Sequence, residues 1–429
     1  MCVRILKLKT FFALIFFIFW YIIRKKNIKN EFAVNKFGGA MKLLKLHVTG
    51  LPLFKEPVDL TFYATQRVSD EDSDRLYPLF SNIYLNCAQA MIGLNASGKT
   101  SMLKVILLAL SILNNEPINY AETKDILGNS EKVTFDIYFC TKDRKICRLQ
   151  TIIAAGEKTE EGYRYRIIEE TLWEKEFSEV RTRKTLTDFE KIHPARTRGL
   201  AEDYLPDDVS IIIARNKQIQ EKLLIQSMLS FTNRNVLPAT TAVPLEIVTF
   251  LDPSVEKLCF VEKEQERQIY LKFFGSDGIL LNHADELNQF LSSGTIKGMI
   301  AFSMAQDVLK KGGYLIMDEI ENHFNKEIVA TLLRFFMDAK LNSHGGILIF
   351  TTHYPEILDE YERNDAIYIL RNQNGITAEN LSALLKRNDI KRSDAYQSGI
   401  LEGTVPSYEA YLRLKKELQR SIRMQEVQA

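Results

Sequence analysis

The sequence predicts an α/β fold in which a mixed sheet with flanking helices carries a smaller, partly helical lobe. Three observations lead to this class. Residues 83–113 contain an apolar strand, a glycine-rich loop and an apolar helix in direct succession. Residues 314–370 alternate short apolar strands with a helix, as parallel sheets do. Residues 131–173 are rich in β-forming residues separated by turn residues, which predicts an antiparallel meander.

The composition is that of a globular protein with enough apolar residues for a large core. Of 429 residues, 46% are hydrophobic and 26% are charged, and the formal net charge is +1. Residues 1–40 hold eight Lys or Arg and one Glu, a net +7, so the rest of the chain carries about −6. This balance excludes a strongly basic nucleic-acid surface over the whole chain and leaves room only for a local patch.

The cysteines indicate the cellular setting. Five cysteines stand at irregular spacing, and the six histidines do not cluster with them: Cys2, Cys87, Cys140, Cys147 and Cys259. This spacing indicates neither a disulfide framework nor a metal-binding motif. We therefore expect a reducing, cytoplasmic location.

The N-terminal extension contains thirteen uninterrupted apolar residues, 11–23, between Lys9 and the basic run 24–26. A membrane-spanning helix needs about 20 residues, so this run is short. It is open to three interpretations: a membrane anchor, which would make the protein membrane-associated; an interfacial helix; or residues that precede the functional start. Met41 favours the last, because it opens MKLLKLHVTGL, whose alternating apolar residues predict the first strand.

The remaining elements follow from hydrophobic periodicity and from turn residues. Strands are expected at 42–49, 57–64, 83–92, 131–140, 144–154, 163–173, 210–214, 257–261, 268–274, 314–317, 346–351 and 366–370. Helices are expected at 98–113, 215–232, 244–251, 294–311, 326–339 and 407–425. The elements divide the chain into five parts. An N-terminal extension (1–40) precedes a lobe with the glycine-rich loop and the meander (41–177) and an insertion lobe (178–295). A second part of the main lobe (296–375) and a helical tail (376–429) follow.

The glycine-rich loop is the first candidate site. The stretch IGLNASGKTSML, 92–103, fits the phosphate-binding pattern G-x-x-x-x-G-K-[ST] at all four fixed positions. Backbone N–H groups of such a loop surround phosphates, and the following helix points its positive end at them. Lys99 would neutralise phosphate charge and Thr100 would coordinate Mg²⁺. The expected ATP-binding residues in this loop are Gly93, Leu94, Asn95, Ala96, Ser97, Gly98, Lys99, Thr100 and Ser101.

A strand ending in two acids, YLIMDEIENHF at 314–324, is the second candidate. A buried strand would deliver Asp318 to Mg²⁺, directly or through water. Glu319 points the other way and would polarise the attacking water. Strands that end in acids are common, but together with the glycine-rich loop this one indicates nucleotide hydrolysis.

Two further stretches complete the set. LSSGTIKGM at 291–299 lies at a helix start, where hydroxyl groups, free N–H groups and the helix dipole form an anion site. The alternative is an ordinary helix cap made by Ser292 or Ser293. ILIFTTHYPEIL at 347–358 is an apolar strand that ends just before His353, for which a structural role is the alternative.

In the order glycine-rich loop, LSSGT, Asp-Glu and His, the sequence resembles the ABC-type ATPases of the SMC and RecF class. DEIENHF also resembles the DE-x-E-x-x-(L/F) block of the OLD-like and abortive-infection ATPases of bacteria, an AAA-family group. The resemblance covers residues 41–416. It implies a P-loop NTPase fold of ABC type, hydrolysis of ATP to ADP and phosphate with Mg²⁺, and a regulatory role in phage defence.

The resemblance also assigns a role to LSSGT, which is similar to the LSGGQ signature of ABC ATPases. That signature reads the γ-phosphate held by the partner subunit, so Ser292 and Gly294 would bind nucleotide in this way. Ser293 and Thr295 stand where the family has a glycine and a glutamine.

His353, by the same resemblance, would contact the γ-phosphate and hold Glu319 and its water in place. With Lys99 these two residues form the expected catalytic set. Two copies of the chain would enclose two ATP–Mg²⁺ head to tail, so the expected partner on ATP binding is a second copy.

Other features narrow the expected role. The segment between the glycine-rich loop and LSSGT is too short and too rich in β-formers for SMC arms. Only 76 residues follow His353 and they hold no D-x-D cluster, so a nuclease activity of this chain alone is not expected. We expect an effector encoded as a separate chain. The alternatives are a RecF- or SMC-like DNA-repair ATPase and a membrane-associated ABC ATPase.

Three smaller features are open to two interpretations each. The basic run 181–198 would contact nucleic-acid phosphates or form a solvated loop. The C-terminal helix would bind a partner protein or pack against the core. Gln150 and Gln218 are candidates for the glutamine lid loop of ABC ATPases.

Overall fold

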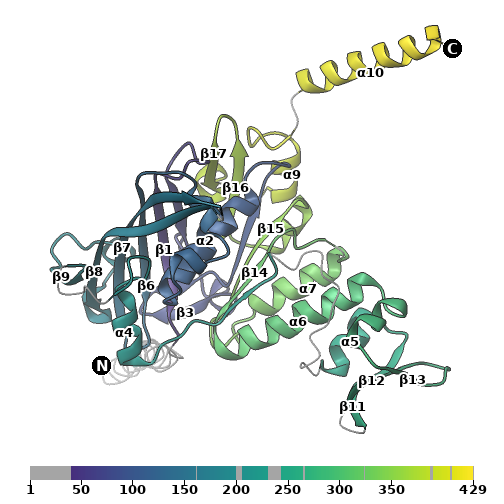
Figure 1. Cartoon of the computed structure of the whole chain (residues 1–429), viewed down its shortest axis with the longest axis horizontal. Helices are drawn as coiled ribbons and strands as arrows, with labels where there is room; N and C mark the ends of the chain where they lie inside the picture. The colour runs from purple at the N-terminus through teal and green to yellow at the C-terminus, as the bar shows by residue number, and fades with distance from the viewer. Residues whose placement is uncertain are drawn as a thin grey trace, which may run out of the picture.

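The computed structural model describes residues 40–160, 162–199, 205–229, 243–263, 266–322, 324–386, 390–405 and 408–428. Two six-stranded sheets dominate this part of the chain (Figure 1). The first is antiparallel and has the order β2-β1-β6-β7-β8-β9. Its strands are β1 (Lys42–Thr49), β2 (Val58–Thr61), β6 (Val133–Cys140), β7 (Lys145–Thr159), β8 (Gly162–Glu176) and β9 (Pro194–Thr197). The predicted meander is confirmed as β6, β7 and β8.

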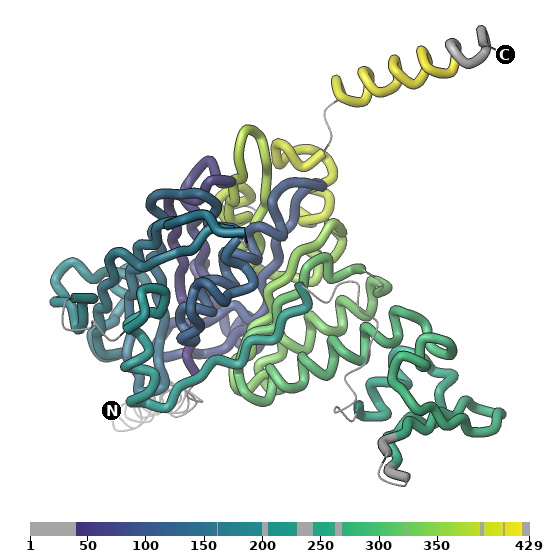
Figure 2. Tube along the Cα trace, viewed as in Figure 1, coloured from purple at the N-terminus to yellow at the C-terminus, as the bar shows by residue number. Residues whose placement is uncertain are grey.

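The second, central sheet has the order β10-β14-β15-β5-β16-β17 and is parallel except for β17. Its strands are β5 (Ala88–Ile92), β10 (Ile225–Ser227), β14 (Tyr314–Met317), β15 (Ile347–Thr352), β16 (Ile367–Asn372) and β17 (Ile376–Asn380). The early strand β5 lies between the late strands β15 and β16, as the colours of the chain path in Figure 2 show. The predicted α/β class is confirmed.

Helix α2 (Lys99–Leu113) lies between the two sheets, and helices α6 (Ser293–Lys311) and α7 (Lys326–Phe336) cover the other face of the central sheet (Figure 1). A helix enclosed on all sides is apolar on all sides, and ten of the fifteen residues of α2 are buried apolar residues. The central strands alternate between the two cores. On β14, residues 314 and 316 face α2, and residues 315 and 317 face α6 and α7.

A smaller outer lobe stands apart from the sheets at the start of α6 (Figure 1). It contains α5 (Leu245–Leu251), the antiparallel strands β11 (Val255–Lys263), β12 (Glu266–Phe273) and β13 (Ile279–Leu281), and the 3-10 helix η6 (Ala284–Gln289). The segment 178–295, expected as one insertion lobe, is divided. Strand β9 joins the first sheet, β10 joins the central sheet, and only residues from 243 onward form the outer lobe.

Two local predictions within that segment are wrong. Residues 210–214 form no strand; helix α4 (Ile212–Ile219) begins there, because Ser210 and the Ile211 N–H bind the buried Glu170 carboxylate and turn the chain. A short apolar run does not distinguish a buried helix from a strand. The helix expected at 215–232 ends at Ile219, and β10 follows, because the edge of the central sheet offers unpaired backbone groups to residues 225–227. Residues 230–232 lie outside the described ranges.

The C-terminal segment contains α8 (Leu381–Leu384), α9 (Arg392–Gln397) and α10 (Tyr408–Gln428). Helix α10 extends away from the body (Figure 1), and Leu414 and Leu418 are exposed. The interpretation that this helix packs against the core is therefore wrong. Within the described residues, no helix has the length and apolar character needed to cross a membrane. Residues 11–23 lie outside the described residues.

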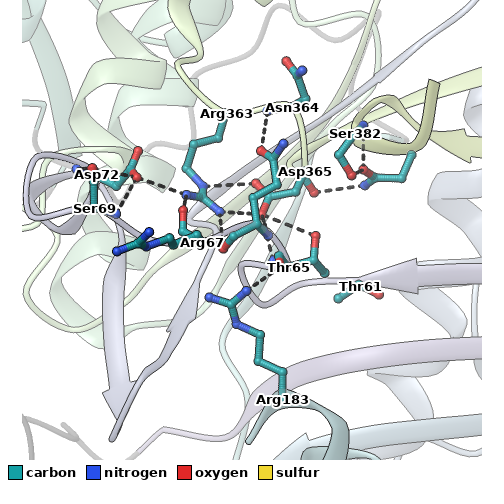
Figure 3. A network of polar contacts seen from close by, with 12 residues as sticks. Thr61, Thr65, Arg67, Ser69, Asp72, Arg183, Arg363, Asn364, Asp365 and Ser382 are labelled. Carbon is teal, nitrogen blue, oxygen red and sulfur yellow. Dashed lines mark hydrogen bonds and ion pairs between the residues drawn. The ribbon is translucent and has the colours of Figure 1, made fainter. Parts of the chain in front are cut away.

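A buried polar network joins the two halves of the body, which are the first sheet and the central sheet. It lies at the amino ends of β5 and β16 (Figure 3). The Asp365 carboxylate, fully buried, accepts bonds from the N–H groups of Thr65 and Gln66 at 2.8 and 2.9 Å. The guanidinium of Arg363 donates to it at 2.6 Å and also reaches Asp72 at 3.3 Å. The network thus fastens the loop after β2 to the start of β16, at the edge opposite to the glycine-rich loop.

Candidate functional site

The glycine-rich loop connects β5 to α2 and needs both of its glycines. Gly98 has φ +92°, and a Cβ there would lie 2.4 Å from the side chain of Ile376. A Cβ on Gly93 would lie 2.4 Å from the Leu370 carbonyl oxygen. Within the described part of the chain, no side chain caps the first turn of α2. Its free N–H groups and its dipole therefore form an anion site.

The Lys99 side chain folds back over this loop. Its ammonium donates to the carbonyl oxygens of Gly93 and Leu94, at 2.9 and 3.0 Å. It also lies 3.3 Å from Nδ1 of His353. Burial lowers the pKa of Lys99, while nearby carboxylates act to raise it. The loop therefore presents a desolvated cation where phosphates would bind.

Thr100 and Asp318 supply two oxygen atoms at one point. The Thr100 hydroxyl donates to Oδ2 of Asp318 at 2.6 Å. The strand alternation explains this contact: residues 314 and 316 of β14 face α2, so Asp318 does as well. Hydroxyl and carboxylate oxygens are the ligands that Mg²⁺ prefers, usually one or two carboxylates together with phosphates of the substrate. The residues present therefore fit Mg²⁺.

Glu319 and His353 form a second pair. Nε2 of His353 lies 3.4 Å from Oε1 of Glu319. Glu319 has φ +48°, an unusual backbone conformation for a residue with a Cβ, and its side chain is 47% exposed. An ammonium can only donate, so Nδ1 of His353 accepts from Lys99.

Lys99, Thr100, Glu319 and His353 line one open cleft of about 870 Å³, whereas Gly93, Leu94 and Asp318 do not line it. Small-molecule sites usually have volumes of about 300–1,000 Å³, so the cleft is large enough for a nucleotide. Of the sequence-predicted residues, those lining it are Asn95, Ala96, Ser97, Gly98, Lys99, Thr100, Ser101, Glu319 and His353. The remaining lining residues, which the sequence did not indicate, come from the β1–β2 turn and the β16–β17 hairpin: Pro52, Leu53, Asn372, Asn374, Gly375 and Ile376.

Two polar residues beside the cleft were also missed. The Thr351 hydroxyl contacts both Asp318 and the backbone of Glu319. Glu321 accepts a hydrogen bond from the His353 N–H at 2.6 Å. Both stand inside stretches already quoted, DEIENHF and ILIFTTHY. Side chains alternate between the two faces along β14 and β15, and this alternation is the sequence signal from which Thr351 could have been found.

Ser292 and Gly294 lie at the start of α6, and neither lines the cleft of its own chain. The Ser292 hydroxyl accepts from the Thr295 N–H at 3.0 Å, so it serves as the helix cap. A cap and a phosphate contact use the same hydroxyl and free N–H groups, so the nucleotide role of these two residues stays a prediction.

The weaker candidates also have defined places. Gln150 donates to Asp136 on the first sheet, and neither it nor Gln218 lines the cleft. In the basic run, Arg183 donates to the Thr65 carbonyl oxygen, and Arg198 donates to those of Val209 and Pro206. Arg183 and Arg198 therefore have intramolecular partners.

Comparison with known proteins places the chain in a family. The family model described as "AAA domain, putative AbiEii toxin, Type IV TA system" matches residues 90–359. A search of curated proteins finds no match. One solved structure, "Structure of the recombination mediator protein RecF-ATP in RecFOR pathway", aligns with 80% of this chain and 100% of that chain, at 8% identity and a TM-score of 0.31. The family match spans more than half of the sequence and includes every motif from the glycine-rich loop to His353, so the chain belongs to this AAA family and carries an AAA-type ATPase domain.

Proposed function

We propose that the chain binds ATP with Mg²⁺ and hydrolyses it to ADP and phosphate. The observation that carries this proposal is the meeting of Lys99, Thr100, Glu319 and His353 at one cleft, with Asp318 bound to the Thr100 hydroxyl. These groups arrive from three strands of one sheet edge, and each suits a separate part of phosphoryl transfer.

The chemistry can be assigned to these groups. Phosphates would lie against the free N–H groups of α2, with Lys99 turning from the loop carbonyls to their oxygens. Mg²⁺ would be held by Thr100 and Asp318 and would neutralise charge on the phosphates. Glu319, partly exposed at the mouth of the cleft, would orient the attacking water and accept its proton. His353, whose Nε2 lies 3.4 Å from Oε1 of Glu319, would hold that carboxylate in place.

We further propose that two copies close head to tail over two nucleotides. Ser292 and Gly294 stand outside the cleft of their own chain, at the capped start of α6, beside the outer lobe. Such a helix start suits an anion presented by another molecule. Hydrolysis would separate the copies, so ATP would act as a conformational switch.

The switch would regulate a separately encoded effector in phage defence. The family description names a toxin of a toxin–antitoxin system, which supports a defence role. We assign the effector activity to another chain.

The test uses the full chain and its Glu319→Gln variant, with Glu71→Gln as a matched control at an exposed position. Phosphate release and mass in solution are measured with and without ATP and Mg²⁺. We expect Glu319→Gln to lower hydrolysis about 100-fold or more, the usual contribution of a general base. We also expect ATP to double its mass, because the closed dimer persists. Normal hydrolysis by this variant would refute the catalytic assignment, and an unchanged mass would refute the dimer.

A further inference from the structure

Thr351 lies at the end of β15 with its side chain directed at both acids of the site. The residue is fully buried. The Glu319 N–H donates to Oγ1 of Thr351 at 2.7 Å, and the Thr351 hydroxyl donates to Oδ1 of Asp318 at 2.5 Å. One hydroxyl group therefore joins the backbone of one acid to the carboxylate of the other.

The direction of these bonds follows from the groups involved. A backbone N–H can only donate, so Oγ1 of Thr351 accepts from Glu319 and its own hydrogen remains available. The ionised carboxylate of Asp318 can only accept, so this hydrogen points to Oδ1. Oδ2 is then the oxygen that faces Thr100, 2.6 Å away. The Thr351 hydroxyl thus sets the rotation of the Asp318 carboxylate.

The same residue holds the backbone that follows. Glu319 has φ +48°, which is unfavourable for a residue with a Cβ. Its N–H is bound by the Thr351 hydroxyl, and the next N–H, of Ile320, donates to the Thr351 carbonyl oxygen at 3.0 Å. Together these two bonds keep the Glu319 side chain beside His353. Without the hydroxyl, the Glu319 N–H loses this partner and the turn is free to relax.

We propose that Thr351 is a positioning residue for ATP hydrolysis, one whose hydroxyl sets the directions of both Asp318 and Glu319. This inference rests on the proposed function and concerns the same cleft. Thr351 lies behind the two acids and does not line the cleft. Its removal should therefore affect turnover more than nucleotide affinity.

The adjacent residue Thr352 provides a matched control. Successive residues of a strand point to opposite faces. Thr352 is also fully buried, but its hydroxyl accepts from the Tyr354 N–H at 3.0 Å and does not line the cleft. Thr→Val at either position keeps the shape and removes one buried hydroxyl.

The experiment compares the full-length wild type with Thr351→Val, Thr351→Ser, Thr351→Ala and Thr352→Val. Steady-state phosphate release gives kcat and KM, calorimetry gives the affinity for ADP without Mg²⁺, and thermal melting reports folding. For Thr351→Val we expect kcat to fall about 10–100-fold, as when residues supporting catalytic ligands are lost, with ADP affinity within about 3-fold. Thr351→Ser should restore kcat to within about 3-fold of wild type, and Thr352→Val should retain it equally.

Several outcomes would overturn the inference. They are an unchanged kcat in Thr351→Val, an equal loss in Thr351→Ser, and an equal loss in Thr352→Val. If Thr351→Val does not fold, the Ser and Ala variants decide, because they differ only in the hydroxyl: equal kcat values refute the inference and a tenfold difference supports it. A wild type that releases no phosphate would instead refute the proposed function itself.

Discussion

Replacement of Asp365 by Asn tests how the two halves of the body are held together. The substitution keeps the size of the side chain but removes the charge that faces Arg363, a residue that is only 8% exposed. It also turns one acceptor oxygen into an NH₂ group that faces the donors of Thr65, Gln66 and Arg363. The variant therefore leaves a buried cation short of its partner.

The expected loss can be estimated from the geometry. Breaking a buried ion pair usually costs about 3–5 kcal/mol. Asp72 stays 3.3 Å from Arg363 and keeps part of the compensation, so we expect the low end, about 3 kcal/mol. With an unfolding entropy of about 2.1 cal/mol/K per residue, this lowers Tm by about 4 °C for the described body.

Thermal melting followed by circular dichroism measures the effect. Asp59→Asn is the matched control, because Asp59 pairs with Lys45 at a half-exposed position and should change Tm by less than about 1 °C. ATP hydrolysis per folded molecule should be unchanged in both variants, since Asp365 lies at the edge opposite to the cleft. A Tm of Asp365→Asn within 1 °C of wild type would refute the reasoning, as would selective loss of hydrolysis.

Two further predictions concern the loop and a buried acid. Gly98→Ala should weaken ADP binding, measured by calorimetry, at least about tenfold, because its Cβ would lie 2.4 Å from Ile376 and φ is +92°. Gly275→Ala is the control: it is also at positive φ, but nothing lies within 4 Å of its Cβ, so this variant should bind ADP normally. Burial raises the pKa of Glu221 to about 7. Its protonated form is therefore favoured in the folded state, so stability should fall as pH rises from about 4.5 through 7, by about 3 kcal/mol. Melting of Glu221→Gln between pH 5 and 8 should lack this fall, and an identical pH profile to wild type would contradict the assignment.

The strongest local patterns predicted their elements well. The strand at 314–317 and the helix at 98–113 agree with β14 and α2 within one residue, because a glycine marks the start of each run. The segment 210–232 was predicted wrongly, because Glu170 and the edge of the central sheet decide its conformation. Those partners lie far away in the sequence, and the propensity of single residues contains no information about them.

The amino-acid sequence by itself determined the motifs and their order, since phosphate binding requires particular residue types at short, fixed spacing. Gly93, Lys99, Asp318 and His353 could be named from local stretches alone. Only the tertiary structure decided which groups meet. The parallel pairing of β5, β14 and β15 brings residues more than 200 positions apart to one sheet edge, and the pleat turns Thr351 toward the acids and Thr352 away from them. Hydrogen bonds between such distant segments depend on the register of the strands, and a register exists only once the sheet has formed.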